Sequence, residues 1–369
     1  MRVAIVHYWL IGMRGGEQVL EAICRLYPAA DIFTLFYDPS AVSPYLRSRN
    51  IKASYLNPLR RFHRSLLPAM PLALESFDLR GYDLIISSES GPAKGVLTPS
   101  TARHICYCHT PMRYLWELYP DYRNDFAGLA GRMLMAPFAS WLRTWDYASA
   151  ARVDAFAANS WNVRRRIWKV WRRRSRVVPP PVNVESFYYA APQDYFLMVS
   201  EMVPYKRLDY AVDSFRRSGR RLKIVGTGPE LASLRKLAGP NIEFCGRVND
   251  AELRELFAHC QAFVMPGEED FGITMVEAMA SGKPVIALGR GGAKELVRDG
   301  CGILYPEHTH DELEAALARF DRCADSFRPL LLTTRAAEFS PGLFERRFRT
   351  AAAGQWDTRE QEIRNLAVV

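Results

Sequence analysis

The sequence predicts an α/β fold built on parallel sheets, and two observations support this class. Short apolar runs alternate with amphipathic stretches along most of the chain, and a run of prolines divides that series into halves of similar length. Strands buried on both faces and separated by helices are typical of parallel sheets. The expected strands cover residues 3–7, 32–36, 84–88, 104–108, 155–159, 196–199, 222–225, 242–244, 262–265 and 284–287. The expected helices include 17–26, 208–217, 230–237, 251–259 and 274–280.

The proline run Pro179-Pro180-Pro181 marks the expected boundary between two domains. Each proline fixes φ and lacks a backbone N–H, so neither a helix nor a central strand tolerates the run. We expect an N-terminal domain at 1–178, a linker at 179–193 and a C-terminal domain at 194–340. Residues 341–369 are expected to hold one further helix, which could pack back on the N-terminal domain.

The composition is that of a soluble globular protein, since 49% of the 369 residues are hydrophobic and 24% are charged. The longest stretches without an acidic or basic residue hold eleven residues each, whereas a membrane-spanning helix needs about 18 or more. The first residues lead into a strand-like run without the pattern of an export signal. With seven scattered cysteines, we expect reduced thiols and a cytoplasmic protein.

A formal net charge of +9 favours anionic partners such as nucleotide phosphates, nucleic acid or a lipid surface. Eight of the thirteen residues at 164–176 are Arg or Lys, and none is acidic. The segment fits a solvated helix with two tryptophans packed on the domain as well as a helix lying on an anionic membrane. Nucleic acid would attract the same charges. The membrane interpretation assigns lipid contact to Arg164, Arg165, Arg166, Trp168, Trp171, Arg172, Arg173 and Arg174.

Two glycine clusters follow expected strands. Gly15-Gly16 lies between the first strand and the first helix, where glycines let a ligand approach the backbone and the helix start offers N–H groups to a phosphate. Such a pair is also often only a tight turn. Gly226 and Gly228 follow the strand at 222–225. Both clusters lack the full dinucleotide fingerprint of three glycines, which disfavours a dehydrogenase.

The most specific motif covers residues 267–278, Gly-Glu-Glu-Asp-Phe-Gly-Ile-Thr-Met-Val-Glu-Ala, between a buried strand and a helix. Glu269 lies in the loop and Glu277 lies one turn into the helix, so one ligand across the helix start could meet both carboxylates. A nucleotide sugar has hydroxyls at its two ends and phosphates between them, so it fits this arrangement. The same glutamates could also be ordinary acidic residues on the surface. The N–H groups that would face the pyrophosphate belong to Gly272, Ile273 and Thr274.

Together these motifs resemble the family 4 retaining glycosyltransferases, over nearly the whole chain. The other matching pieces are Asn159-Ser160, the proline run, Gly291-Gly292, His109-Thr110-Pro111 and Val203-Pro204-Tyr205-Lys206-Arg207. The resemblance implies a GT-B architecture, with two Rossmann-like doubly wound domains facing across a cleft. The residues around His109 and Glu269 are most similar to bacterial GDP-mannose-dependent mannosyltransferases of polysaccharide and O-antigen synthesis.

The resemblance also implies roles for single residues. Glu269 would bind hydroxyls of the donor sugar, Glu277 would hold the ribose, and His109 would face the sugar. Lys206 would neutralise the departing diphosphate, which is electrostatic stabilisation where charge develops. The catalytic set is then His109, Lys206 and Glu269. The donor-binding set is Gly15, Gly16, Arg207, Gly226, Gly228, Phe271, Gly272, Ile273, Thr274 and Glu277.

One position departs from the family pattern, because Glu201 stands where an Arg is common five residues before the lysine. A carboxylate cannot bind a diphosphate, so either Arg207 or Arg14 would replace that cation or Glu201 would point elsewhere. The chain has no Asp-x-Asp sequence, which agrees with a reaction that uses no divalent metal and no other cofactor. Zinc is disfavoured because only three neighbouring ligands are available, from Cys106, Cys108 and His109.

We therefore expect a retaining glycosyltransferase that moves a hexose, with mannose from GDP-mannose as the expected donor, to a saccharide acceptor. The acceptor is expected to be lipid-linked at the inner face of the membrane. A nucleotide-sugar epimerase of the same fold is an alternative that needs no acceptor. A basic nucleic-acid-binding protein would explain the charge but neither the spacing of the glutamates nor Lys206, so nucleic acid is not an expected partner.

Overall fold

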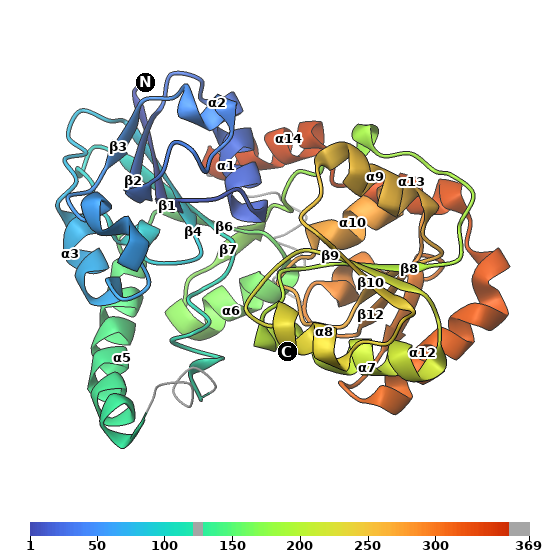
Figure 1. Cartoon of the computed structure of the whole chain (residues 1–369). Coiled ribbons are helices and arrows are strands. Elements are labelled where there is room, and N and C mark those ends of the chain that lie inside the picture. Colours follow the sequence, from blue (N-terminus) through green and yellow to red (C-terminus); the bar gives the residue numbers. More distant parts are fainter. Residues whose placement is uncertain (121–127, 354–369) are drawn as a thin grey trace, which may run out of the picture. The chain divides into compact units, whose positions relative to one another are not determined.

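The computed structural model describes residues 1–120 and 128–353, and the side chains of 1–120 and 135–353. The chain divides into two compact units. The first comprises Met1–Pro179 and Phe344–Val369, and the second comprises Pro180–Leu343. Each unit is built on one parallel sheet flanked by helices (Figure 1). The predicted α/β class is therefore confirmed.

The first unit contains a seven-stranded sheet in the order β3-β2-β1-β4-β5-β6-β7. All the neighbouring strands in this order are parallel. The strands are β1 Val3–Leu10, β2 Asp31–Tyr37, β3 Ile51–Ala53, β4 Leu84–Glu89, β5 Arg103–Cys108, β6 Ala155–Ala158 and β7 Ser175–Val177. The helices are α1 Gly15–Leu26, α2 Pro44–Arg47, α3 Met70–Glu75, α5 Gly128–Ala150, α6 Trp161–Trp171 and α14 Pro341–Ala352.

Alternation along β1 sends its side chains to two separate cores. Val3 and Ile5 pack in one cluster with α1 and with the aromatic residues of α14. Ala4 and Val6 pack in another with α3. A third cluster fixes α6 against β5 and β6 through Ile167 and other apolar residues. Both faces of the sheet are thus covered, as parallel sheets require.

The second unit contains a six-stranded sheet in the order β10-β9-β8-β11-β12-β13. Its strands are β8 Phe196–Val199, β9 Leu222–Val225, β10 Ile242–Gly246, β11 Phe263–Met265, β12 Val285–Leu288 and β13 Gly302–Tyr305. Its helices are α7 Leu208–Ser218, α8 Leu231–Leu237, α9 Asp250–His259, α10 Ile273–Ala280, α11 Ala293–Leu296, α12 His310–Cys323 and α13 Pro329–Ala337.

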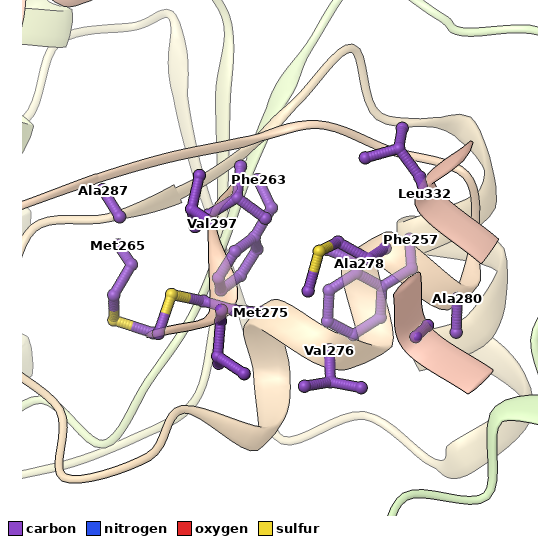
Figure 2. Close-up of a cluster of buried hydrophobic side chains, with 14 of the residues drawn as sticks. Phe257, Phe263, Met265, Met275, Val276, Ala278, Ala280, Ala287, Val297 and Leu332 are labelled. Atoms are coloured by element: carbon purple, nitrogen blue, oxygen red, sulfur yellow. The ribbon is translucent and has the colours of Figure 1, made fainter. Parts of the chain in front are cut away.

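Two cores cover the two faces of this sheet. One contains residues of α7, α8 and α12. The other contains residues of α9, α10 and α13, and its centre is the apolar side of α10. Figure 2 shows Met275 and Val276 of α10 among Phe257, Phe263 and Met265. This packing holds the start of α10 in a fixed position at the end of β11.

The ten expected strands are present, with ends shifted by at most three residues, and so are the five expected helices. Three strands were not expected, namely β3, β7 and β13, and each lies at the edge of a sheet. Short edge strands need no continuous apolar run, so periodicity does not reveal them. The helix expected after residue 340 spans Pro341–Ala352, and residues 354–369 of that expectation lie outside the described residues.

No helix within residues 1–120 and 128–353 combines the length and the apolar composition needed to cross a membrane.

Candidate active site

The second sheet has a topological switch point between β8 and β11. The chain adds β9 and β10 on one side of β8 and then adds β11, β12 and β13 on the other side. Ligands of open parallel sheets bind at such a point, outside the carboxyl ends of the strands. Lys206 follows β8 and Glu269 follows β11, so both predicted residues lie at this edge. An ion pair joins Lys206 Nζ to Glu269 Oε1, and only 14% and 21% of the two side chains are exposed.

Glycines bring the loops of this edge together. A Cβ at Gly267 would lie 2.7 Å from the carbonyl oxygen of Lys206 and 2.9 Å from its Cα, so only glycine permits this approach. Side chains at Gly291 and Gly292 would overlap the backbone of Glu269 and Phe271. The Gly292 N–H donates to the Glu269 carbonyl oxygen at 2.8 Å. The backbones that carry the lysine and the glutamate are therefore fixed by close contact.

Helix α10 begins directly beside this pair. Gly272 has a φ of 101° and precedes Ile273, the first helical residue. The first N–H groups of a helix, here those of Ile273 and Thr274, lack acceptors within the helix and favour an anion. The side chain of Phe271 is buried and does not face the surface where a donor would bind. It is 5% exposed and its ring packs against Phe339, so its side chain belongs to the core.

Glu277 lies on the second turn of α10 and is half-buried. Burial, together with the charge of Asp250, raises the pKa of its carboxyl to about 7. Among the described residues the Glu277 side chain forms no hydrogen bond or ion pair. A carboxylate in this position can accept hydrogen bonds from the hydroxyls of a ligand.

The glycines after β9 have a packing role. Gly226 has a φ of 131°, and a Cβ there would overlap the carbonyl oxygen of Ser200. A Cβ at Gly228 would likewise overlap the carbonyl oxygen of Met202. The loop after β9 therefore packs backbone to backbone on the loop after β8, and this contact explains both glycines without a ligand.

Arg207 is the nearest candidate for the cation that Glu201 does not supply. It follows Lys206 directly, has a φ of 52°, and its Nε donates to Asp209 Oδ1 at 3.0 Å. Its side chain is 41% exposed. Arg14 lies in the other unit, at the start of α1. Glu201 lies in the loop between β8 and Lys206, and its side chain is half-buried.

The first unit has its own switch point, between β1 and β4. Gly15 and Gly16 open α1 after β1, and His109 follows β5. A Cβ at Gly16 would lie 3.9 Å from His109 Nε2, so the structure brings these predicted residues together. Ser88 Oγ lies 3.0 Å from the same nitrogen, and the His109 N–H donates to the Glu89 carbonyl oxygen at 2.7 Å. Burial and the neighbouring His7 lower the pKa of His109 to about 3.

Sequence reasoning missed two buried partners of this edge. His7 on β1 is fully buried, and its Nε2 lies 3.6 Å from Glu17 Oε1 on the first turn of α1. Neither ring nitrogen of His7 has a hydrogen-bond partner within the described part of the chain. The available signal was the alternation along β1, which places His7 on the same face as Val3 and Ile5.

The basic segment differs from the predicted surface helix. Helix α6 ends at Trp171, Arg172 adopts a left-handed conformation with a φ of 55°, and Arg176 lies in β7. Trp171 is 2% exposed, and Arg166 is 7% exposed, with its Nε 2.7 Å from Glu117 Oε1. The prediction of lipid contact is therefore wrong for Arg166 and Trp171, because the apolar face of α6 packs on the sheet.

The exposed face of α6 and its end is a narrow stripe. Its exposed residues include Lys169, and four others, Trp161, Arg165, Trp168 and Arg172, are spaced so that they follow one side of the helix; we call these four the α6 stripe. Arg164 stacks over the Trp161 ring, 4.7 Å from its centroid. Of the predicted segment, Arg173 is half-buried and donates to the carbonyl of Val153, and Arg174 is exposed.

Cys106 and Cys108 share one buried cluster, as the alternation of the strand predicts. No group of three His, Cys, Asp or Glu side chains in the described parts of the chain could hold a metal ion.

Comparisons with known proteins agree with this architecture. Residues 13–186 match the family described as Glycosyltransferase Family 4, and residues 189–326 match the family described as Glycosyl transferases group 1. The solved structure of HepE from Anabaena in complex with UDP superposes with a TM-score of 0.70 at 16% identity. That likeness covers 96% of this chain and all of HepE, and it shows the fold. The fold is thus the GT-B fold with two Rossmann-like domains, and the chain belongs to glycosyltransferase family 4.

Curated relatives match shorter segments. An uncharacterized glycosyltransferase of Methanocaldococcus jannaschii is 31% identical over 149 residues, which are 39% of this chain and 42% of that protein. The GDP-mannose-dependent alpha-(1-6)-phosphatidylinositol monomannoside mannosyltransferase of Mycobacterium tuberculosis is 35% identical over 178 residues, which are 43% of each chain. The matched segments span less than half of these relatives.

Proposed function

We propose that this protein is a retaining glycosyltransferase that takes a hexose from a nucleotide sugar, with mannose from GDP-mannose as the donor. The observation that carries the proposal is the pairing of Lys206 with Glu269 at the switch point, beside the start of α10. The helix start and a cation together suit a diphosphate, and the adjoining carboxylate suits sugar hydroxyls. The second unit would then bind the donor.

The pair suggests how transfer is assisted. As the bond from the sugar to the diphosphate breaks, negative charge grows on the leaving oxygen, and Lys206 stabilises it. Glu269 pairs with the same lysine and accepts hydrogen bonds from hydroxyls of the sugar, so one ion pair orients both parts of the donor. Glu277 holds the ribose hydroxyls. Arg207 lies beside Lys206 and supplies a second cation when the diphosphate replaces Asp209 as its partner.

Mannose is supported by the relative from Mycobacterium tuberculosis, whose name specifies GDP-mannose and phosphatidylinositol monomannoside. For this chain we propose a lipid-linked saccharide acceptor, bound by the first unit near His109. A lowered pKa keeps the His109 ring neutral at pH 7, so it can accept or donate a hydrogen bond without a charge.

We further propose that the protein contacts an anionic membrane at the inner face, through the α6 stripe of Trp161, Arg165, Trp168 and Arg172. Indole rings lie at the interface of a bilayer, and guanidinium groups meet its head groups. The stripe replaces the longer surface predicted from the sequence, two residues of which are buried.

The donor assignment can be tested by thermal shift with GDP-mannose, GDP-glucose, UDP-glucose and UDP-galactose. A ligand that binds the native state raises the melting temperature in proportion to RT ln(1 + [L]/Kd), so GDP-mannose should produce the largest increase. Transfer of labelled mannose to a lipid extract then separates a transferase from an epimerase, which would convert the sugar without an acceptor. Absence of any shift with all four donors would contradict the proposal.

The role of Lys206 predicts a defined loss of activity. Lys206→Ala should lower kcat by about 100-fold, because it removes one charge that stabilises the transition state. Lys223→Ala is the matched control, since Lys223 lies on the same sheet and pairs with Glu243 at 3.2 Å. Steady-state kinetics with GDP-mannose measure both variants. Equal activity of the two would move the leaving-group role to another residue.

A further inference from the structure

A cavity of about 540 Å³ lies in the second unit, at the amino-terminal edge of its sheet. Its lining includes Asp194, Gln261 and Lys283, which come just before β8, β11 and β12 respectively. The candidate donor site lies after the carboxyl ends of the same strands. The cavity is therefore at the opposite edge of the sheet and takes no part in the site described above.

Lys283 is the basic residue in the lining of this cavity, which also contains Asp194 and Asp325. The residue is 2% exposed, its Nζ donates to the Ala190 carbonyl oxygen at 2.8 Å, and the same nitrogen lies 4.6 Å from the centroid of the Tyr189 ring. No carboxylate lies within ion-pair distance of it among the described residues. A buried ammonium group normally has a charged partner, and its three N–H donors outnumber the one carbonyl available here. Lys283 is thus suited to an anionic group of a ligand.

The rest of the lining combines aromatic rings with amide and carboxylate groups. Tyr189, Phe320 and Phe327 provide aromatic surfaces, while amide and carboxylate groups lie beside them. Gln261 Nε2 donates to Asp194 Oδ1 at 2.9 Å, which orients both side chains. Asp194 and Asp325 would repel a small inorganic anion. The same carboxylates can accept hydrogen bonds from the hydroxyls of a sugar. Aromatic rings provide apolar surface for the C–H face of a sugar ring.

From these contacts we propose that the cavity is a second ligand site, which binds a saccharide bearing one anionic group, a phosphate or a carboxylate. The anionic group contacts Lys283, the hydroxyls meet Asp194 and Gln261, and the ring lies on Tyr189. The site is separate from the donor site and does not depend on which nucleotide sugar the enzyme uses.

Calorimetric titration of the full-length protein tests the site with four probes: mannose 6-phosphate, glucuronate, mannose and inorganic phosphate. We expect one of the two anionic sugars to bind at least about 10-fold more tightly than both mannose and inorganic phosphate. The better of the two shows whether the anionic group is a phosphate or a carboxylate. Failure of both mannose 6-phosphate and glucuronate to bind more tightly than mannose and inorganic phosphate would overturn the saccharide site.

Variants locate the binding. Lys283→Met should weaken binding of the anionic sugar at least about 10-fold, whereas the matched control Lys223→Met should leave it unchanged. Lys206→Ala should also leave it unchanged, which separates this site from the donor site. Tyr189 is 50% exposed, so Tyr189→Ala should fold normally and still lose affinity. Wild-type affinity in Lys283→Met and Tyr189→Ala, or its loss in Lys206→Ala, would overturn the proposal.

Discussion

Glu277 has a protonation equilibrium close to neutral pH. Burial and the charge of Asp250 raise its pKa from the usual 4.5 to about 7. Between these two values the folded protein binds more protons than the unfolded chain, so the free energy of unfolding falls as the pH rises. Glu277→Gln removes the ionisable carboxyl and with it this loss of stability at higher pH. We expect the free energy of unfolding of the variant, relative to that of wild type, to rise by about 1 to 3 kcal/mol when the pH is raised from 4 to 8.

Urea denaturation at pH 4 and pH 8 measures the two differences in free energy of unfolding. Glu243→Gln is the control, because Glu243 has a 61% exposed side chain on β10 of the same sheet. Its relative stability should change little with pH. A Glu277→Gln variant with the same stability difference at both pH values would show that the pKa of Glu277 is not raised.

Which single residues lie in the candidate site could be predicted only in part. Lys206 and Glu269 were recognised by their motifs, but they are 63 positions apart, and only the strand order brings β8 beside β11. Ser88 and His7 carry no motif, since a serine and a histidine in apolar strands are common. Phe271 lies inside the motif, yet its side chain is buried and its ring packs against Phe339 in the core.

At the scale of elements, two of the three tryptophans of α6, Trp168 and Trp171, have opposite environments. Trp171 is 2% exposed, its Nε1 donates to Asp146 Oδ2 at 2.8 Å, and its ring lies 4.3 Å from Lys94 Nζ. Trp168 is 51% exposed. Trp171→Ala should lower the free energy of unfolding by about 3 to 5 kcal/mol, whereas Trp168→Ala should change it by less than about 0.5 kcal/mol. Urea denaturation compares them, and similar losses would contradict the observed orientation of α6.

The α6 stripe predicts salt-dependent binding to anionic vesicles. Each basic residue near such a surface contributes about 1 kcal/mol, so Arg165→Gln/Trp168→Ala/Arg172→Gln should bind vesicles containing phosphatidylglycerol at least about 10-fold more weakly than wild type. A matched control removes the same charges elsewhere, in Arg235→Gln/Lys236→Gln/Leu330→Ala. Sedimentation at rising salt, with neutral vesicles in parallel, measures the binding. Equal loss in both triple variants would indicate net charge rather than the stripe.

The elements that sequence patterns revealed are those with strong apolar periodicity. The strands at the centres of the sheets were found because both of their faces are buried. The sequence predicts one basic helix over residues 164–176, whereas β7 begins at Ser175, because nothing in the sequence around Arg172 requires the left-handed conformation that ends α6 there. Tertiary packing of Trp171 on the sheet sets that boundary, and a single sequence does not contain it.

At the scale of the whole molecule, the two units repeat one arrangement. In each, the order of the strands reverses beside the first strand of the unit, and the candidate residues follow the strands at that point or, for His109, the neighbouring strand β5. The alternation of strands and helices predicted the class, but it does not state the strand order. Many orders satisfy the same pattern, so the positions of the two sites required the structure.

Helix α14 follows the second unit in sequence but packs in the core of the first unit. Phe348 of α14 is fully buried in the first unit, where the core also contains Ile5 and Tyr107. Phe348→Ala should cost about 3 to 5 kcal/mol, and this cost should fall on the first unit although the residue follows the second unit in sequence. In calorimetry the transition of the first unit should move to lower temperature, with limited proteolysis identifying the unit that opens. Leu330→Ala, at a side chain 78% exposed on α13, should shift neither transition. A shift confined to the second unit would show that α14 does not stabilise the first.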